Sequence, residues 1–365
     1  MWDQVEELLE RGIAEGAFPG CAMAAGQREQ VLYTGVHGYL SQDKQRKVSA
    51  ATRYDVGALT QVLAAVPLLL YALERGLVSA DDPLSAFERA VPQDKKDITL
   101  HNLLTHTAGM TPFFLLPQEA ENAHSALHAL LKHPLANNVG AKVRDSAMGY
   151  LLLGFLLEKI LNMPLDEAVK RFLCTPLSLA GTGFLPSGED VAPTNIQSDS
   201  DDRQAGSPYD ENARFLHGVS GHAGLFTNLD DLSRFASMLA CNGHTQSDVF
   251  LSPRAIHLAT TERTRGLNEA RGYGFHIAKR SDPFLGHLWP SESYGLSDPA
   301  TGSLLAVSPA DGFFMVLLTN AQSAPQNKRN TERIHKLLCN AAYAAFQHQN
   351  PTPIQPNEQS GGLFN

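Results

Sequence analysis

The segment from Val56 to Leu77 predicts a helix that is apolar on all sides, and this feature constrains the fold of the chain more than any other. Its apolar residues include Val62, Leu63, Val66, Leu68, Leu69, Leu70 and Leu73. Such a helix has no polar face to turn toward water, so it belongs at the centre of a large core. Pro67 lacks a backbone N–H and should kink the helix.

Short β-like runs lie at both ends of the chain, with helical patterns between them. A helix over 1–16 precedes strands at 21–25 and 30–34, and strands at 273–278, 304–307 and 313–319 precede a helix over 326–347. We therefore predict an α/β (α+β) fold in which both ends pair in one sheet. The predicted domains are a sheet domain (1–77 plus 265–347), a helical lobe (78–264) and a disordered tail (348–365).

Composition narrows the partners and the compartment. The net charge of −9 argues against nucleic acid and anionic membrane surfaces, and no apolar run is expected to reach the roughly 18–20 residues needed to span a bilayer. The acidic N-terminus does not resemble a secretory leader. Four widely spaced cysteines, Cys21, Cys174, Cys241 and Cys339, are predicted to be buried thiols. These features predict a cytoplasmic protein, or an exported one if a leader was removed.

The segment Tyr54–Val62 resembles the nucleophile segment of the serine β-lactamase and penicillin-binding-protein superfamily. In that family Ser-x-x-Lys opens a long buried helix, and the serine attacks a carbonyl with the help of the lysine. Here Ala58 has no hydroxyl and Gln61 has no titratable amine. The resemblance therefore implies a hydrolase fold without that hydrolase's nucleophile.

Further segments extend the resemblance over about 15–345. They lie at 101–110, 149–154, 192–194, 209–213 and 218–226. Together they are similar to class C β-lactamases, DD-peptidases and esterases, and to a branch sometimes fused to a glycoside hydrolase that acts on cell-wall sugars. The resemblance implies an antiparallel sheet flanked by helices, an inserted helical lobe, and a site in the cleft between them.

Two other motifs of the family are also altered. Where the family has Tyr-x-Asn or Tyr-Ser-Asp, this chain reads Asp145-Ser146-Ala147, so Asp145 replaces the tyrosine that relays protons. Where the family has Lys-Thr-Gly or His-Thr-Gly, the chain reads Leu296-Ser297-Asp298. A second register over His287-Leu288-Trp289 does not restore the motif either.

The resemblance predicts a vestigial cleft with no catalytic residue. Its predicted binding residues are Ala58, Gln61, Asp145, Ala147, Leu296, Ser297 and Asp298. We expect the backbone N–H of Ala58 to remain available to polarise a carbonyl. Unpaired carboxylates at Asp145 and Asp298 should repel anions, which favours a neutral or cationic small ligand, or a protein partner.

Other serines offer replacement nucleophiles, but with weak support. Ser146 holds a position where a hydroxyl commonly bonds to backbone. Ser220 precedes His222 too closely for a catalytic pair to be the expected arrangement. Ser41 and Lys44 match Ser-x-x-Lys, but in a polar turn. We interpret that match as a solvated loop.

Metal and nucleotide chemistry lack a convincing pattern. His124 and His128 share a predicted helical face after Glu121, but no third ligand follows at a suitable spacing. We predict an exposed polar face there, no metal and no cofactor. The chain contains no phosphate-binding glycine motif.

Three hypotheses remain open from the sequence. The first is a catalytically inactive protein that binds a ligand or partner in its cleft. The second is an active serine hydrolase whose nucleophile has moved to Ser146 or Ser220. The third is a scaffold whose cleft is irrelevant and whose lobe or tail meets a partner.

Overall fold

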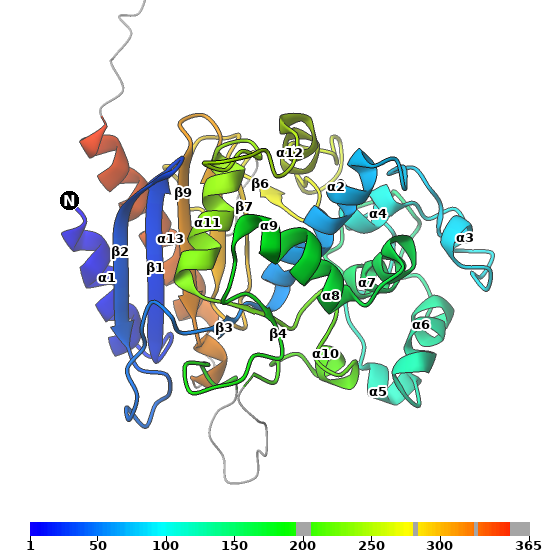
Figure 1. The fold of residues 1–365 in the computed structure, drawn as a ribbon, viewed down its shortest axis with the longest axis horizontal. Coiled ribbons are helices and arrows are strands. Elements are labelled where there is room, and N and C mark those ends of the chain that lie inside the picture. Colours follow the sequence, from blue (N-terminus) through cyan, green and yellow to red (C-terminus); the bar gives the residue numbers. More distant parts are fainter. Residues whose placement is uncertain (195–205, 280–283, 325–327, 351–365) are drawn as a thin grey trace, which may run out of the picture.

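The two ends of the chain meet in one sheet. The computed structural model describes residues 1–194, 206–279, 284–324 and 328–350. Its main sheet has six strands in the order β2-β1-β9-β8-β7-β6, all paired antiparallel (Figure 1). The strands are β1 (Gly20–Gln27), β2 (Gln30–Gly38), β6 (His276–Ile277), β7 (Tyr294–Ser297), β8 (Leu304–Ser308) and β9 (Phe313–Thr319). β1 pairs with β9, as the sequence pattern predicts.

Helices cover both faces of this sheet. Because side chains alternate along a strand, Cys21 and Met23 of β1 join a core with α1 (Asp3–Ala14) and α13 (Lys328–Gln349). Ala22 and Ala24 of β1 point into the larger core on the opposite face. There α11 (Leu229–Ala240) packs on β1, β8 and β9.

The helical lobe forms the other half of the molecule (Figure 1). Its helices, with those that border it, are α3 (Leu84–Phe87), α4 (Leu100–Leu104), α5 (Leu116–Glu119), α6 (Ala123–Lys132), α7 (Ala147–Leu161), α8 (Leu165–Val169), η3 (Lys170–Cys174), α9 (Thr175–Leu177), α10 (Glu211–Phe215) and α12 (Pro253–Thr260). A small sheet of β3 (Tyr54–Asp55), β5 (Leu225–Thr227) and β4 (Gly183–Phe184) accompanies it.

The predicted lobe boundaries require one correction. The range 78–264 includes α11, which packs on the main sheet. An amphipathic pattern shows that a helix has an apolar face, but not which apolar surface that face covers. The lobe is therefore smaller than predicted.

The apolar run after Val56 lies at the centre of the core, as predicted. It is divided into a short 3-10 helix η1 (Gly57–Leu59), a π-helical turn η2 (Gln61–Ala65) and the α-helix α2 (Val66–Glu74). Pro67 stands in the first turn of α2, directly after the helical turn η2, and has no N–H to continue the helical hydrogen bonds. The expected kink is thus a change of helix type just before the proline.

One expectation about membranes was wrong. Gly57–Glu74 is long and apolar enough to cross a bilayer, and the bent pair Ala147–Leu161 plus Leu165–Leu177 passes the same test if it is counted as one span. However, 72% of the Gly57–Glu74 stretch is buried inside the protein. It serves here as the core helix.

The C-terminal helix extends slightly further than predicted. α13 ends at Gln349, so the first two positions of the predicted tail are helical. Asn350 is described as a bend after the helix, and the remaining predicted disorder, from 351 to 365, falls outside the described residues.

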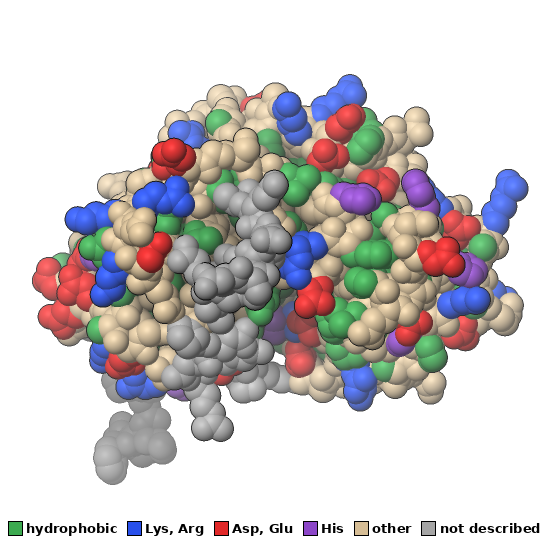
Figure 2. Space-filling model, turned by 90° about the horizontal axis from the view of Figure 1, so that it is seen from below, with side chains coloured by type: hydrophobic (Ala, Val, Ile, Leu, Met, Phe, Trp, Pro, Cys, Tyr) green, Lys and Arg blue, Asp and Glu red, His purple; other side chains and the backbone are tan. Residues whose placement is uncertain are grey.

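The four cysteines are free thiols. Cys21, Cys174 and Cys339 are buried, as predicted, and Cys241 is half-buried. On the face seen from below, acidic and basic side chains are interspersed over the described surface (Figure 2). The net negative charge is therefore not gathered into one patch on the described part of this face.

His335 makes the stability of this fold sensitive to acid. Its Nε2 donates to the carbonyl of Gly302 (2.9 Å), and burial lowers the pKa of the imidazole to about 4. Unfolding therefore takes up a proton between about pH 6.5 and 4, so stability falls as the pH falls through that window. The His335→Gln variant can still donate to Gly302 but does not titrate. Between pH 7 and 4, its free energy of unfolding should therefore fall by about 3 kcal/mol less than that of the parent. Urea midpoints at each pH measure this, and parallel curves for the two chains would contradict it.

Candidate functional site

Ala58 lies where β3 passes into the central helix. The turn is held by Asp55, which is buried and whose carboxylate accepts the N–H groups of Gly57 (2.9 Å) and Tyr209 (2.7 Å). Burial raises the pKa of Asp55 to about 7, although these two hydrogen bonds oppose the shift. Gly57 has a φ of +52°, a left-handed conformation that favours glycine.

The backbone N–H of Ala58 is already engaged. It donates to Oδ2 of Asp298 at 2.8 Å. This corrects the expectation that the N–H stays available to polarise a carbonyl. A carboxylate oxygen stands where the oxygen of a bound acyl group would have to accept that hydrogen bond.

Asp298 is fixed in this position by its own loop. It follows β7 directly, and its Oδ1 accepts the N–H groups of Ala300 (2.8 Å) and Thr301 (2.7 Å). The residue is only 9% exposed. Burial raises the pKa of Asp298 above its ordinary value, and the backbone hydrogen bonds counteract part of that rise. Gly57 packs directly beneath the carboxylate, because a Cβ there would lie 2.5 Å from Oδ2.

The segment Leu296-Ser297-Asp298 lies next to the turn that holds Ala58, and Asp298 makes the hydrogen bond to it. β7 packs on η1. Leu296 is buried and pairs with Leu305, whereas Ser297 is half-buried and pairs with Leu304. The alternative register is not supported by packing at this site. Trp289 donates to the carbonyl of Cys339 on α13.

Gln61 is buried in η2, on the side of the core that meets α7. Its exposure is 4%, and its Oε1 has no hydrogen-bond partner within the described part of the chain. η2 packs on α7, which begins at the half-buried Ala147. A neutral amide here removes the positive charge that the family's lysine would supply.

Asp145 is paired, which corrects the expectation of an isolated carboxylate. Its Oδ2 accepts from Nη2 of Arg271 at 2.9 Å, and Nε of Arg271 donates to Glu269 at 3.1 Å. Burial raises the pKa of Asp145, but His106 and Arg271 lower it more, so the net pKa is below its ordinary value. Because Arg271 balances its charge, Asp145 is not expected to repel anions from the cleft.

Arg271 is the residue that sequence reasoning missed. It is buried to 2% exposure although it is a charged residue. No motif of the resemblance includes it, and one arginine in a β-rich stretch carries no signal of its own. Only the fold brings it next to Asp145.

His106 lies beside this ion pair and is held neutral. Its Nδ1 accepts the N–H of Ser146 (3.1 Å), so the remaining proton belongs on Nε2. Burial lowers the pKa of His106 to about 4. Burial and the Arg271 charge also lower the pKa of His276. These imidazoles therefore add no positive charge at neutral pH.

Ser146 has the structural role that the sequence suggests. It caps α7 by accepting the N–H of Gly149 (3.2 Å), and its hydroxyl donates to the carbonyl of Thr111 (2.8 Å). The hydroxyl is therefore committed to backbone groups and does not bond to the nearby His106, whose Nδ1 accepts the backbone N–H of Ser146.

Ser220, His222 and Asp210 form a chain of hydrogen bonds that the sequence analysis undervalued. Oγ of Ser220 lies 2.5 Å from Nδ1 of His222, and Nε2 of His222 lies 3.0 Å from Oδ1 of Asp210. Ser220 is 3% exposed and borders a cavity of only about 20 Å³. That volume suits about one water molecule and no acyl substrate.

The remaining candidates lie apart from the cleft residues. Ser41 hydrogen-bonds Asp43 in its own turn (2.7 Å), and His124 and His128 lie on α6. Among the described residues, no group of three or more His, Cys, Asp or Glu side chains is arranged to hold a metal ion.

Comparisons with known proteins agree with this geometry at the level of family and fold. A sequence model of the Beta-lactamase family matches residues 5–338. The chain is 26% identical, over 363 residues, to an N-acetylmuramyl-L-alanine amidase of Bacillus subtilis (strain 168), covering 88% of this chain and 81% of the relative.

Two solved structures are similar in fold. A penicillin-binding protein homologue from Caulobacter crescentus has a TM-score of 0.75 at 20% identity, covering 94% of this chain and 97% of that one. A class C beta-lactamase from Rhodobacter sphaeroides has a TM-score of 0.71 at 16% identity, covering 93% and 99%.

Proposed function

Because this chain belongs to the beta-lactamase family, we propose that it is a catalytically inactive member that works by binding a ligand or a partner in its cleft. The hydrogen bond from Ala58 to Asp298 is the observation that carries this proposal. Acyl transfer needs a nucleophile, a base and donors for the oxyanion. Ala58 supplies no nucleophile, and the N–H that could bind the oxyanion is held by a carboxylate.

The bases are missing as well. Gln61 and Asp145 replace the lysine and tyrosine that the resemblance assigns to proton transfer. The Asp145 carboxylate, bound to Arg271, holds its proton weakly and is a poor base. These substitutions support the absence of hydrolysis and not merely slower hydrolysis.

The ligand is proposed to be neutral or cationic. An anionic ligand would compete with Asp298 for the N–H of Ala58 and would meet that carboxylate at close range. A ligand without negative charge avoids this conflict.

A second candidate function rests on the Ser220 hydrogen-bond chain. A serine bound to a histidine that is bound to a carboxylate can act as a nucleophile. The burial of Ser220 and its 20 Å³ cavity weigh against this candidate. An active role would require the segment to open.

The two candidates predict different labelling. With chromogenic β-lactams, p-nitrophenyl esters and a fluorophosphonate probe, the parent chain is expected to show no turnover and no adduct by intact-mass spectrometry. Ser220→Ala and Ser146→Ala serve as matched controls. An adduct mapped to Ser220, with turnover abolished by Ser220→Ala, would establish the second candidate and refute the first.

A further inference from the structure

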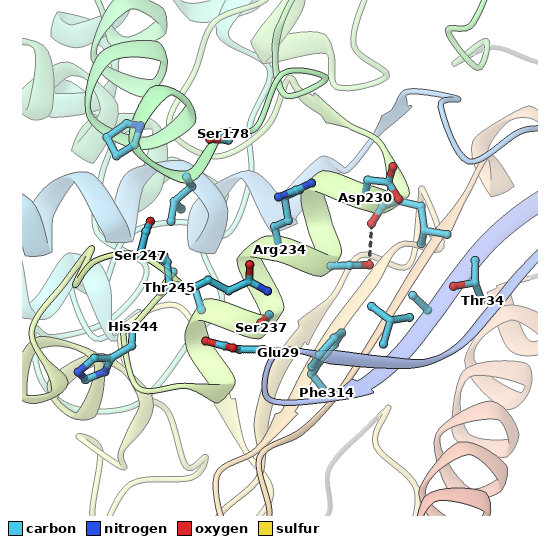
Figure 3. Close-up of a pocket in the computed structure, with 18 residues that line it drawn as sticks. Glu29, Thr34, Ser178, Asp230, Arg234, Ser237, His244, Thr245, Ser247 and Phe314 are labelled. Atoms are coloured by element: carbon cyan, nitrogen blue, oxygen red, sulfur yellow. Dashed lines mark hydrogen bonds between the residues drawn. The ribbon is translucent and has the colours of Figure 1, made fainter.

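A separate pocket of about 450 Å³ lies between α11, the β1–β2 hairpin and the loop at 244–247 (Figure 3). None of the cleft residues described above lines it. Its volume lies within the range of sites for small molecules. It is therefore a candidate binding site independent of the Ala58 cleft.

The pocket has an apolar floor. Phe314 of β9, Met238 of α11 and Leu177 of α9 line it and are buried. Val31 of β2 also lines it and is 50% exposed. Val31 is therefore the apolar surface that a ligand could remove from water, because Phe314 and Met238 are already shielded from it.

Three charged side chains of both signs surround this floor. Asp230 and Arg234 come from α11, and Glu29 comes from the turn of the β1–β2 hairpin (Figure 3). All three are exposed. Within the ranges that the structure describes, none of these three side chains forms an ion pair or hydrogen bond.

The neighbouring polar groups are partly committed elsewhere. Asp231, the carboxylate next to Asp230, accepts from Gly181 (2.7 Å) and Thr182 (2.8 Å). Ser233 donates to the carbonyl of Leu229 at 2.7 Å, the contact drawn in Figure 3. Arg234 is thus the cation, and Glu29 and Asp230 the anions, that the pocket offers to a ligand.

We propose that this pocket binds a zwitterionic amino acid or short peptide with an apolar side chain. The carboxylate pairs with Arg234, whose planar guanidinium suits that group. The ammonium pairs with Glu29 or Asp230, and the apolar side chain covers Val31. A simple anion would face two carboxylates and a simple cation would face Arg234, so a ligand with both charges fits better than either.

The dipeptide L-alanyl-L-phenylalanine is the probe for the test. Its N-acetyl derivative lacks the ammonium group, and its C-terminal amide lacks the carboxylate. Methyl-labelled methionine reports binding by NMR, because Met238 lines the pocket whereas Met148 is buried in α7. The dipeptide should shift the Met238 signal saturably and leave that of Met148 unchanged.

Charge-removing variants assign each end of the ligand. Arg234→Gln should weaken dipeptide binding at least about tenfold and leave binding of the amide unchanged. Glu29→Gln combined with Asp230→Asn should weaken the dipeptide but not the N-acetyl derivative. Arg254→Gln removes an exposed arginine outside this pocket and is the matched control.

Three outcomes would overturn the proposal. The first is the absence of a saturable Met238 shift up to about 10 mM dipeptide. The second is an equal effect of Arg234→Gln and Arg254→Gln. The third is equally tight binding of the N-acetyl derivative and the dipeptide, which would show that the pocket recognises only the carboxylate.

Discussion

A chain carrying Ala58→Ser and Gln61→Lys should be acylated only slowly by a fluorescent penicillin, and adding Asp298→Gly should make acylation much faster. The double variant regains a nucleophile and an amine, but Asp298 still occupies the N–H of residue 58. One oxyanion donor contributes about 10²–10³ to the rate, so the triple variant should react at least about a hundredfold faster than the double. Intact-mass spectrometry over time measures both rates.

Two controls isolate the role of the carboxylate. The variant Ala58→Ser, Gln61→Lys, Asp298→Asn removes the negative charge but keeps the side chain in place, and it should stay slow. Urea midpoints verify that each chain is folded, since Asp298 also binds Ala300 and Thr301. Equal acylation of the double and triple variants would show that Asp298 does not block the site.

Replacing Arg271 by methionine should lower the free energy of unfolding by about 3 kcal/mol. The guanidinium is 2% exposed and bridges Asp145 and Glu269, whose side chains are 55% and 43% exposed. Its loss leaves both carboxylates without the cation that they share. Because both carboxylates can be hydrated again, the loss of stability should be at the low end of the range for breaking a buried ion pair. Urea denaturation measures the change.

Neutralising the partners tests this explanation. Arg271→Met combined with Asp145→Asn and Glu269→Gln should recover much of the lost stability, because no unpaired charge remains. Arg271→Lys keeps the positive charge but lacks the planar guanidinium that bonds two carboxylates at once. Its stability should lie between that of the parent and that of Arg271→Met. If the triple variant is as unstable as the single one, lost packing and not charge explains the effect.

The sequence predicts those parts of the fold that depend on local pattern. The apolar run after Val56, the proline within it and the β-rich ends of the chain each have a period or a breaker that identifies them. The range predicted for the lobe includes α11, because a helical pattern does not show which layer a helix packs on. Choosing between the layers requires the tertiary arrangement.

The candidate site divides in the same way. Ala58, Gln61, Asp145 and Asp298 could be located because each replaces a known residue type in a motif. Their interactions could not be predicted, since Ala58 and Asp298 are 240 positions apart and Arg271 lies 126 positions from Asp145. A substitution identifies the chemistry that is lost, whereas the new partner of the substituted residue depends on the whole fold.

The pairing of β1 with β9 has a consequence for synthesis on the ribosome. Cys21 has its sheet partner at Thr319, and Gly20 donates to Asn320 across 300 positions. The nascent chain therefore cannot complete its sheet until almost all of it has left the ribosome. Until then the apolar face of the β1–β2 hairpin stays uncovered. Premature termination before β9 would leave β1 as an open edge prone to aggregation.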